Sequence, residues 1–171
     1  MELPPKIKAL LNLKSFFALL LTVYAVWLVF AYRYHFIDNT NLIFHEAGHF
    51  LFVFFGDYLQ FLGGSIFQLL IPLGIAGYFA MKRDMFAAAF CGIWLGESLM
   101  NVAVYVGDAK VMSLHLIGGT HDFNWLFTRW NLLEEAILIG KGLHICASII
   151  VIISLLFMYR SLWSVQGKAR I

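Results

Sequence analysis

The sequence predicts an all-α fold: a polytopic membrane helical bundle with four spanning helices and one shorter membrane helix. Of its 171 residues, 61% are hydrophobic and 13% are charged, whereas soluble domains carry about 25% charged residues. Several apolar runs approach the ~20 residues that a helix needs to cross a bilayer. These runs are too long and uninterrupted for a membrane barrel, and only helices or closed barrels span lipid. We therefore expect one integral membrane domain over residues 1–171, and the net charge of +2 gives no indication of a nucleic-acid partner.

Four apolar segments are expected to cross the membrane. The first covers residues 15–32 and follows three lysines, as the apolar part of a signal peptide would. Its apolar run is too long for a signal peptide and no small-residue cleavage site follows it, so we expect a retained anchor. The other three segments are residues 62–81, 84–107 and 136–159.

Lysine and arginine cluster at three segment ends, and these clusters predict the topology. Such residues gather on the cytoplasmic side of a membrane. Five crossings would place two of the three clusters outside, whereas four crossings place all three inside. We therefore expect residues 41–56 to form a helix that enters the membrane and returns, so that it and residues 108–135 lie toward the outer face. The clusters are Lys6, Lys8 and Lys14; Lys82 and Arg83; and Arg160, Lys168 and Arg170.

The segment NLIFHEAGHFLFVFF, residues 41–55, places two histidines and a glutamate in an otherwise apolar run. The letters HEAGH fit the pattern H-E-x-x-H. On a helix, His45 and His49 lie one turn apart on one face and can bind one Zn²⁺, while Glu46 can take a proton from the zinc-bound water. The pattern also occurs in helices that bind nothing. An ionisable group inside a bilayer costs several kcal/mol, however, and a metal would supply a partner for all three.

A catalytic zinc needs a third protein ligand, and Asp108 is the preferred one. It ends a polar face on the third spanning segment, where Glu97, Asn101, Tyr105 and Asp108 are spaced by four, four and three residues and so share one side of a helix. The four-crossing topology places Asp108 at the level of His45. A fifth crossing would separate the two by roughly 20–30 Å.

Other residues remain open as the third ligand. Glu97 lies about three turns deeper than Asp108 and is the second choice. His121 and Asp122, in the segment GGTHDFNW, could be a ligand, partners of the ligands or donors to a transition state. Asn101 and Tyr105 are possible partners of the site or of a substrate, whereas Ser65 and Gln68 on residues 62–81 are expected only to bond helices together. The remaining candidates are His115 and His144.

The chain resembles the membrane-embedded zinc metallopeptidases of the site-2 protease type. The resemblance rests on HEAGH in a membrane helix, on the glycines of FGDYLQFLGG after it, and on an aspartate of a later apolar helix. It implies that His45, His49 and Asp108 hold zinc and that Glu46 activates water. The family's aspartate stands in an Asn-Pro and Asp-Gly context, whereas this chain has YVGDAK, and no PDZ domain is present. The chain is also similar to small bacterial membrane proteins without an assigned activity.

The residues and the resemblance together predict a zinc metallopeptidase that cleaves a membrane-bound or membrane-proximal peptide. The same activated water attacks esters, so a zinc-dependent hydrolase of a lipid or another amphiphile is the alternative. A third possibility is a metal-binding transporter or sensor, which would need a continuous polar path and a releasable ion. The expected cofactor is Zn²⁺, the expected partners are membrane lipid and a peptide substrate, and the expected location is a bacterial inner membrane.

Overall fold

The computed structural model describes residues 4–115 and 119–168. Within them the chain forms six α-helices and one short 3-10 helix, and no strand, which confirms the all-α prediction. Four helices are long and apolar enough to cross a membrane, as expected of an integral membrane protein. They match the four predicted spans, although α1 and α3 begin earlier than predicted and α6 ends later. They are α1 (Pro5–Ala31), α3 (Asp57–Met81), α4 (Met85–Gly107) and α6 (Ala136–Lys168).

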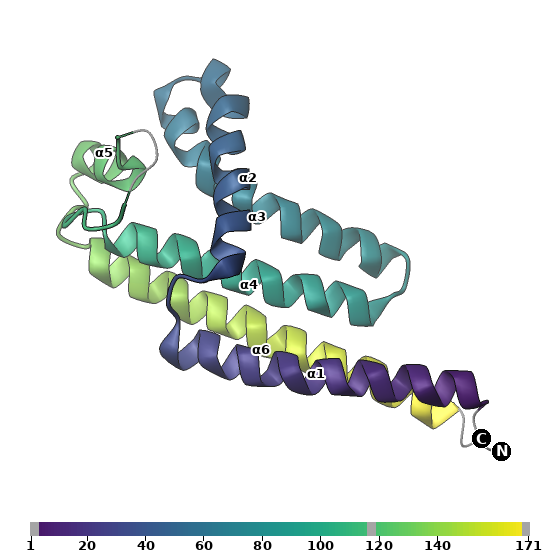
Figure 1. Cartoon of the computed structure of the whole chain (residues 1–171). Helices are drawn as coiled ribbons and strands as arrows, with labels where there is room; N and C mark the ends of the chain where they lie inside the picture. The colour runs from purple at the N-terminus through teal and green to yellow at the C-terminus, as the bar shows by residue number, and fades with distance from the viewer. Residues whose placement is uncertain (1–3, 116–118, 169–171) are drawn as a thin grey trace.

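Helix α4 lies at the centre of the bundle. It packs against α3 on one side and α6 on the other, and α1 lies along α6 (Figure 1). Small residues allow the close approach of α4 and α6, because a Cβ added at Gly96 would lie 2.5 Å from Cγ2 of Val151. Stripes of small residues are the usual means of helix packing in membranes. His144 belongs to this packing, since its Nε2 lies 3.0 Å from the carbonyl oxygen of Val29 in α1.

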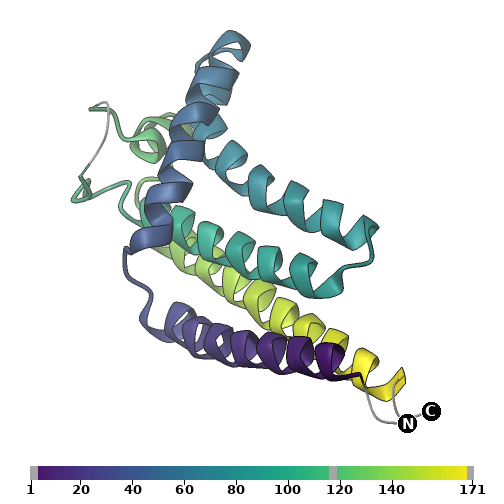
Figure 2. The same cartoon turned by 45° about the vertical axis from the view of Figure 1, so that its right-hand side comes forward.

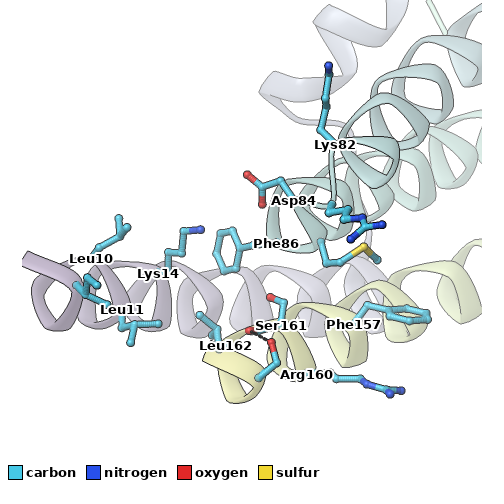
Figure 3. Close-up of a pocket in the computed structure, with 14 residues that line it drawn as sticks. Leu10, Leu11, Lys14, Lys82, Asp84, Phe86, Phe157, Arg160, Ser161 and Leu162 are labelled. Atoms are coloured by element: carbon cyan, nitrogen blue, oxygen red, sulfur yellow. Dashed lines mark hydrogen bonds between the residues drawn. The ribbon is translucent and has the colours of Figure 1, made fainter. Parts of the chain in front are cut away.

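The two ends of the bundle differ in character. Both termini and the α3–α4 turn lie at one end, whereas α5 (Asp122–Trp130) lies at the other (Figures 1 and 2). Cations from all three predicted clusters line one pocket of about 530 Å³ at the first end (Figure 3). The four-crossing topology requires the three clusters to lie at one end of the bundle. Arg170, a member of the third cluster, lies outside the described residues. The lining cations are Lys14, Lys82, Arg83 and Arg160.

The motif helix, α2 (Phe36–Phe52), stands steeply against the axes of α1, α4 and α6 (Figure 1). It begins earlier than the predicted residue 41, because the side chain of Asp38 accepts from the backbone N–H of His35 at 2.7 Å and so caps the start of the helix. It ends in the 3-10 helix η1 (Val53–Phe55), and the chain turns into α3 at Gly56, whose φ of +88° favours glycine.

Candidate metal centre

The histidines of the motif lie close to an aspartate at the end of the bundle opposite the termini. Nε2 of His45 lies 2.9 Å from Oδ2 of Asp122, and Nε2 of His49 lies 3.1 Å from the same oxygen. His45 and Asp122 are buried, and His49 is half-buried. Two imidazoles and one carboxylate are the donor set of a catalytic zinc site. Helix α2 supplies both histidines and the first residue of α5 supplies the aspartate.

Hydrogen bonds on the far side of each imidazole fix which nitrogen faces the aspartate. The amide nitrogen of Gln68 donates to Oδ1 of Asn101 at 3.0 Å, which leaves its Oε1 to accept from Nδ1 of His45 at 3.2 Å. Nδ1 of His49 donates to the carbonyl oxygen of Gln60 at 2.7 Å, because a carbonyl can only accept. Both Nδ1 atoms therefore carry a hydrogen, and a neutral imidazole then presents the lone pair of Nε2 to the centre.

This assignment means that the centre needs a positive charge. A neutral imidazole with its hydrogen on Nδ1 cannot donate from Nε2 to a carboxylate. Each contact with Asp122 therefore requires either a proton on the histidine or a cation between the groups. A divalent metal bound by His45, His49 and Asp122 would satisfy all three groups together, so these residues fit a metal site.

Glycines bring the backbone of α3 against the centre. A Cβ added at Gly64 would lie 2.7 Å from Nε2 of His45 and 2.7 Å from Nε2 of His49. A Cβ added at Gly48 would lie 2.2 Å from the carbonyl oxygen of Gly63. Helices α2 and α3 therefore touch through their backbones, and Gly64 forms one wall of the site.

The environment of Asp122 keeps its carboxylate charged. Burial acts to raise the pKa of Asp122, but hydrogen bonds and positive charge from His45 and His49 in their protonated forms outweigh burial and lower it. The backbone N–H of Asp122 donates to the hydroxyl of Tyr105 at 2.9 Å, which ties the start of α5 to the end of α4. Tyr105, expected to be a partner of the site or of a substrate, thus contacts the backbone of Asp122.

Glu46 lies next to the two histidines on α2 and is half-buried. Its charge reaches His49: burial acts to lower the pKa of His49, but the Asp122 carboxylate, the carbonyl of Gln60 and the charge of Glu46 together raise it. Glu46 is therefore close enough to the centre for its charge to act on His49.

Asp108 does not join the histidines, contrary to the expectation from its place on the helix face. Its carboxylate accepts from the backbone N–H and hydroxyl of Ser113 and from the backbone N–H of Leu114. Burial acts to raise the pKa of Asp108, but these three bonds and the charge of His121 lower it. Asp108 ends α4 and fixes the chain that leads toward α5, while Asp122 takes the place predicted for the third ligand.

His121 connects Asp108 with the centre. Its Nδ1 accepts from the backbone N–H of Asn124 at 3.3 Å and so caps α5. Its Nε2 points to Asp108, 3.5 Å from Oδ2, and its ring stacks on Tyr105 with centroids 4.2 Å apart. Burial is the largest influence on the pKa of His121 and lowers it. His121 therefore caps the helix whose first residue is Asp122.

The remaining predicted residues lie outside the group formed by His45, His49 and Asp122. Asn101 contacts Gln68 rather than a histidine, and Glu97 belongs to a separate buried cluster with His35 and Asp38. His115 is exposed. Gln68, predicted only to join helices, is the partner of His45. In the sequence, Gln68 shares one helix face with Ser65 and Pro72, and this polar face was the only indication of its role. Helical spacing does not indicate which residue of another helix Gln68 contacts.

Comparison of the chain with protein-family models, with curated proteins and with solved structures found no match.

Proposed function

We propose that the chain is a zinc-dependent metallopeptidase that cleaves a membrane-bound or membrane-proximal peptide. The observation that carries the proposal is the convergence of His45, His49 and Asp122, with both Nδ1 hydrogens already used on Gln68 and Gln60. Three protein ligands leave one position open in a tetrahedral zinc site, which is the arrangement of catalytic rather than structural zinc. A helix that carries H-E-x-x-H with such a site supports peptide hydrolysis.

The residues around the centre have separate roles in this proposal. Zinc, when bound, makes water acidic enough to ionise near neutral pH and polarises a carbonyl group. Glu46 accepts the proton from the attacking water and returns it to the leaving amine. Gln68 and the carbonyl of Gln60 hold the two imidazoles in register. Gly64 leaves the histidines enough room to adopt that register.

The position of the centre supports a substrate at the membrane surface. Helix α5 carries Trp125 and Trp130, and Tyr58 of α3 stacks on Trp130 with centroids 6.2 Å apart. Arg129 lies over the ring of Trp125, 3.5 Å from its centroid. Aromatic rings with a nearby cation are typical of the membrane–water interface. The centre therefore lies near the interface opposite the basic end, and a bacterial inner membrane is the proposed location.

The test measures metal and turnover separately. Purified protein should contain about one equivalent of zinc at this centre, and His49→Ala should remove it. In vesicles that contain a membrane-spanning peptide, Glu46→Gln should keep its zinc and lose cleavage, because general-base catalysis contributes about 10²–10⁴-fold. Glu135→Gln, the same change at an exposed position, should cleave like the wild type.

Two results would contradict the proposal. Unchanged cleavage by Glu46→Gln would remove the general base and with it the reaction scheme. Release of fatty acid from the vesicle lipids, without cleavage of the peptide, would assign the centre to a lipid hydrolase instead.

A further inference from the structure

A second buried cluster joins the start of α2 to the middle of α4. It contains His35, Asp38 and Glu97, each of which offers one ligand atom, and these atoms all lie within 4.8 Å of one another. Asp38 is 1% exposed and Glu97 is 0% exposed. Two carboxylates in a bundle that spans a bilayer need compensating positive charge, because an uncompensated buried charge costs several kcal/mol.

One oxygen of Glu97 faces the centre of this cluster without a partner. Its Oε2 accepts from the side-chain amide of Asn41 at 2.9 Å. Its Oε1 is buried and has no hydrogen-bond partner among the described residues. Nε2 of His35 lies 3.8 Å from it. Buried carboxylate oxygens without a partner are rare and mark a missing proton or ion.

The hydrogen bonds of His35 leave its Nε2 for a ligand. Nδ1 lies 2.7 Å from Oδ2 of Asp38 and 3.1 Å from the carbonyl oxygen of Arg33. Both of these oxygens are acceptors when Asp38 is ionised, so Nδ1 carries the hydrogen. Nε2 then has a lone pair, which accepts from the hydroxyl of Tyr24. A histidine whose Nδ1 a carboxylate orients, and whose Nε2 lone pair faces a ligand site, is the arrangement found around protein-bound zinc, and here a cation would displace the Tyr24 hydroxyl from that lone pair.

We propose that His35, Asp38 and Glu97 bind a second divalent cation. Nε2 of His35 and Oε1 of Glu97 face it directly, and Asp38 supplies the second negative charge and orients the imidazole. Two ligands of a tetrahedral zinc with bonds of 2.0–2.2 Å are about 3.4 Å apart, close to the 3.8 Å between these two atoms. One divalent cation with two carboxylates and a neutral imidazole leaves no net charge in this cluster.

A chain of hydrogen bonds connects this cluster with the first centre. The side-chain amide of Asn101 donates to Oδ1 of Asp38 at 2.8 Å. Gln68 donates to Asn101 at 3.0 Å and accepts from His45. The second cation therefore acts on the first centre by fixing the carboxylate of Asp38, at which these hydrogen bonds begin. The proposal does not depend on peptidase activity, because it concerns binding alone.

The experiment counts metal in purified detergent-solubilised protein after equilibrium dialysis against zinc. The wild type should bind two equivalents, and Glu97→Gln, which keeps the shape of the side chain, should bind one. His49→Ala, which removes a ligand of the first centre, should also bind one, and the double variant none. Glu135→Gln is the matched control for the Glu→Gln change at an exposed position and should bind two. Monodisperse elution of each variant checks its folding.

The stoichiometries separate this proposal from the proposed function. A wild type with two equivalents that Glu97→Gln leaves unchanged would overturn the second site. A wild type with one equivalent would overturn it if His49→Ala removes that metal, because Glu97 would then hold only a proton. One equivalent removed by Glu97→Gln and kept by His49→Ala would support the second site and contradict the first.

A second variant tests the binding atom of His35. Tyr24→Phe removes the hydroxyl that donates to Nε2, so the variant should keep two equivalents and bind the second zinc more tightly. Weaker binding of the second zinc by Tyr24→Phe would show that Nε2 is not the ligand, and would overturn the assignment.

Discussion

Substitution of Gly64 by alanine should weaken metal binding without removing any ligand. The new Cβ would lie 2.7 Å from Nε2 of both His45 and His49, whereas ordinary contact begins at 3.4 Å. The imidazoles would have to move by about 0.7 Å, several times the ±0.2 Å within which metal–ligand distances hold. Overpacking of this kind costs about 1–3 kcal/mol. At about 1.4 kcal/mol for each factor of ten, the loss of zinc affinity should be about 5- to 150-fold.

The assay is a zinc titration in competition with a chelator, with the thermal unfolding temperature of the metal-free protein measured in parallel. Gly77→Ala is the matched control, because it lies on the same helix and an added Cβ there meets nothing within 4 Å. Equal zinc affinities for Gly64→Ala and Gly77→Ala would refute the reasoning that Gly64 shapes the centre. Equal affinities would also mean that the histidines bind metal in another rotamer.

Three further predictions concern the surroundings of the centre. Gln68→Ala removes the acceptor for Nδ1 of His45 and should lower zinc affinity by about 10- to 100-fold in the same titration; an unchanged affinity would contradict the register role of Gln68. The pKa of Asp108 is lowered in the fold, so its bonds to the 113–114 backbone should persist below the usual carboxyl pKa of about 4 and break as the pH falls further. Hydrogen exchange at the Leu114 amide, corrected for intrinsic rate, should then rise, and Asp108→Asn should show no such transition. Cysteines placed at Lys82 and Thr120 should be labelled from opposite sides of the membrane, and labelling from one side would exclude four crossings.

Much of the fold follows from the sequence because lipid imposes a simple rule. Each spanning helix needs about 20 apolar residues, and four such runs stand out between charged turns such as Lys82 and Arg83. The start of α2 was harder to predict, because His35 and Asp38 form its cap although the apolar run begins later. The His45–His49 pair was predictable, because a spacing of four residues on a helix fixes a common face.

The third ligand could not be derived in the same way. Asp108 and Asp122 both lie at the end of the bundle where the third ligand was expected. Helical spacing favoured Asp108, because it continues the face of Glu97 and Asn101. The structure places the carboxylate of Asp108 on the backbone at Ser113 and Leu114. The chain then returns as α5 and brings Asp122 to the histidines. Sequence periodicity describes residues within one helix, whereas this choice depends on a turn between two helices.

The separation of 77 residues between His45 and Asp122 has a consequence for biosynthesis. Ribosomes add about 5–20 residues per second, so the two histidines precede the aspartate by roughly 4–15 s. During that interval the motif helix can be inserted beside α3 while its set of ligands is incomplete. In the proposed function, binding of the metal by all three ligands therefore follows synthesis of the start of α5, which carries Asp122.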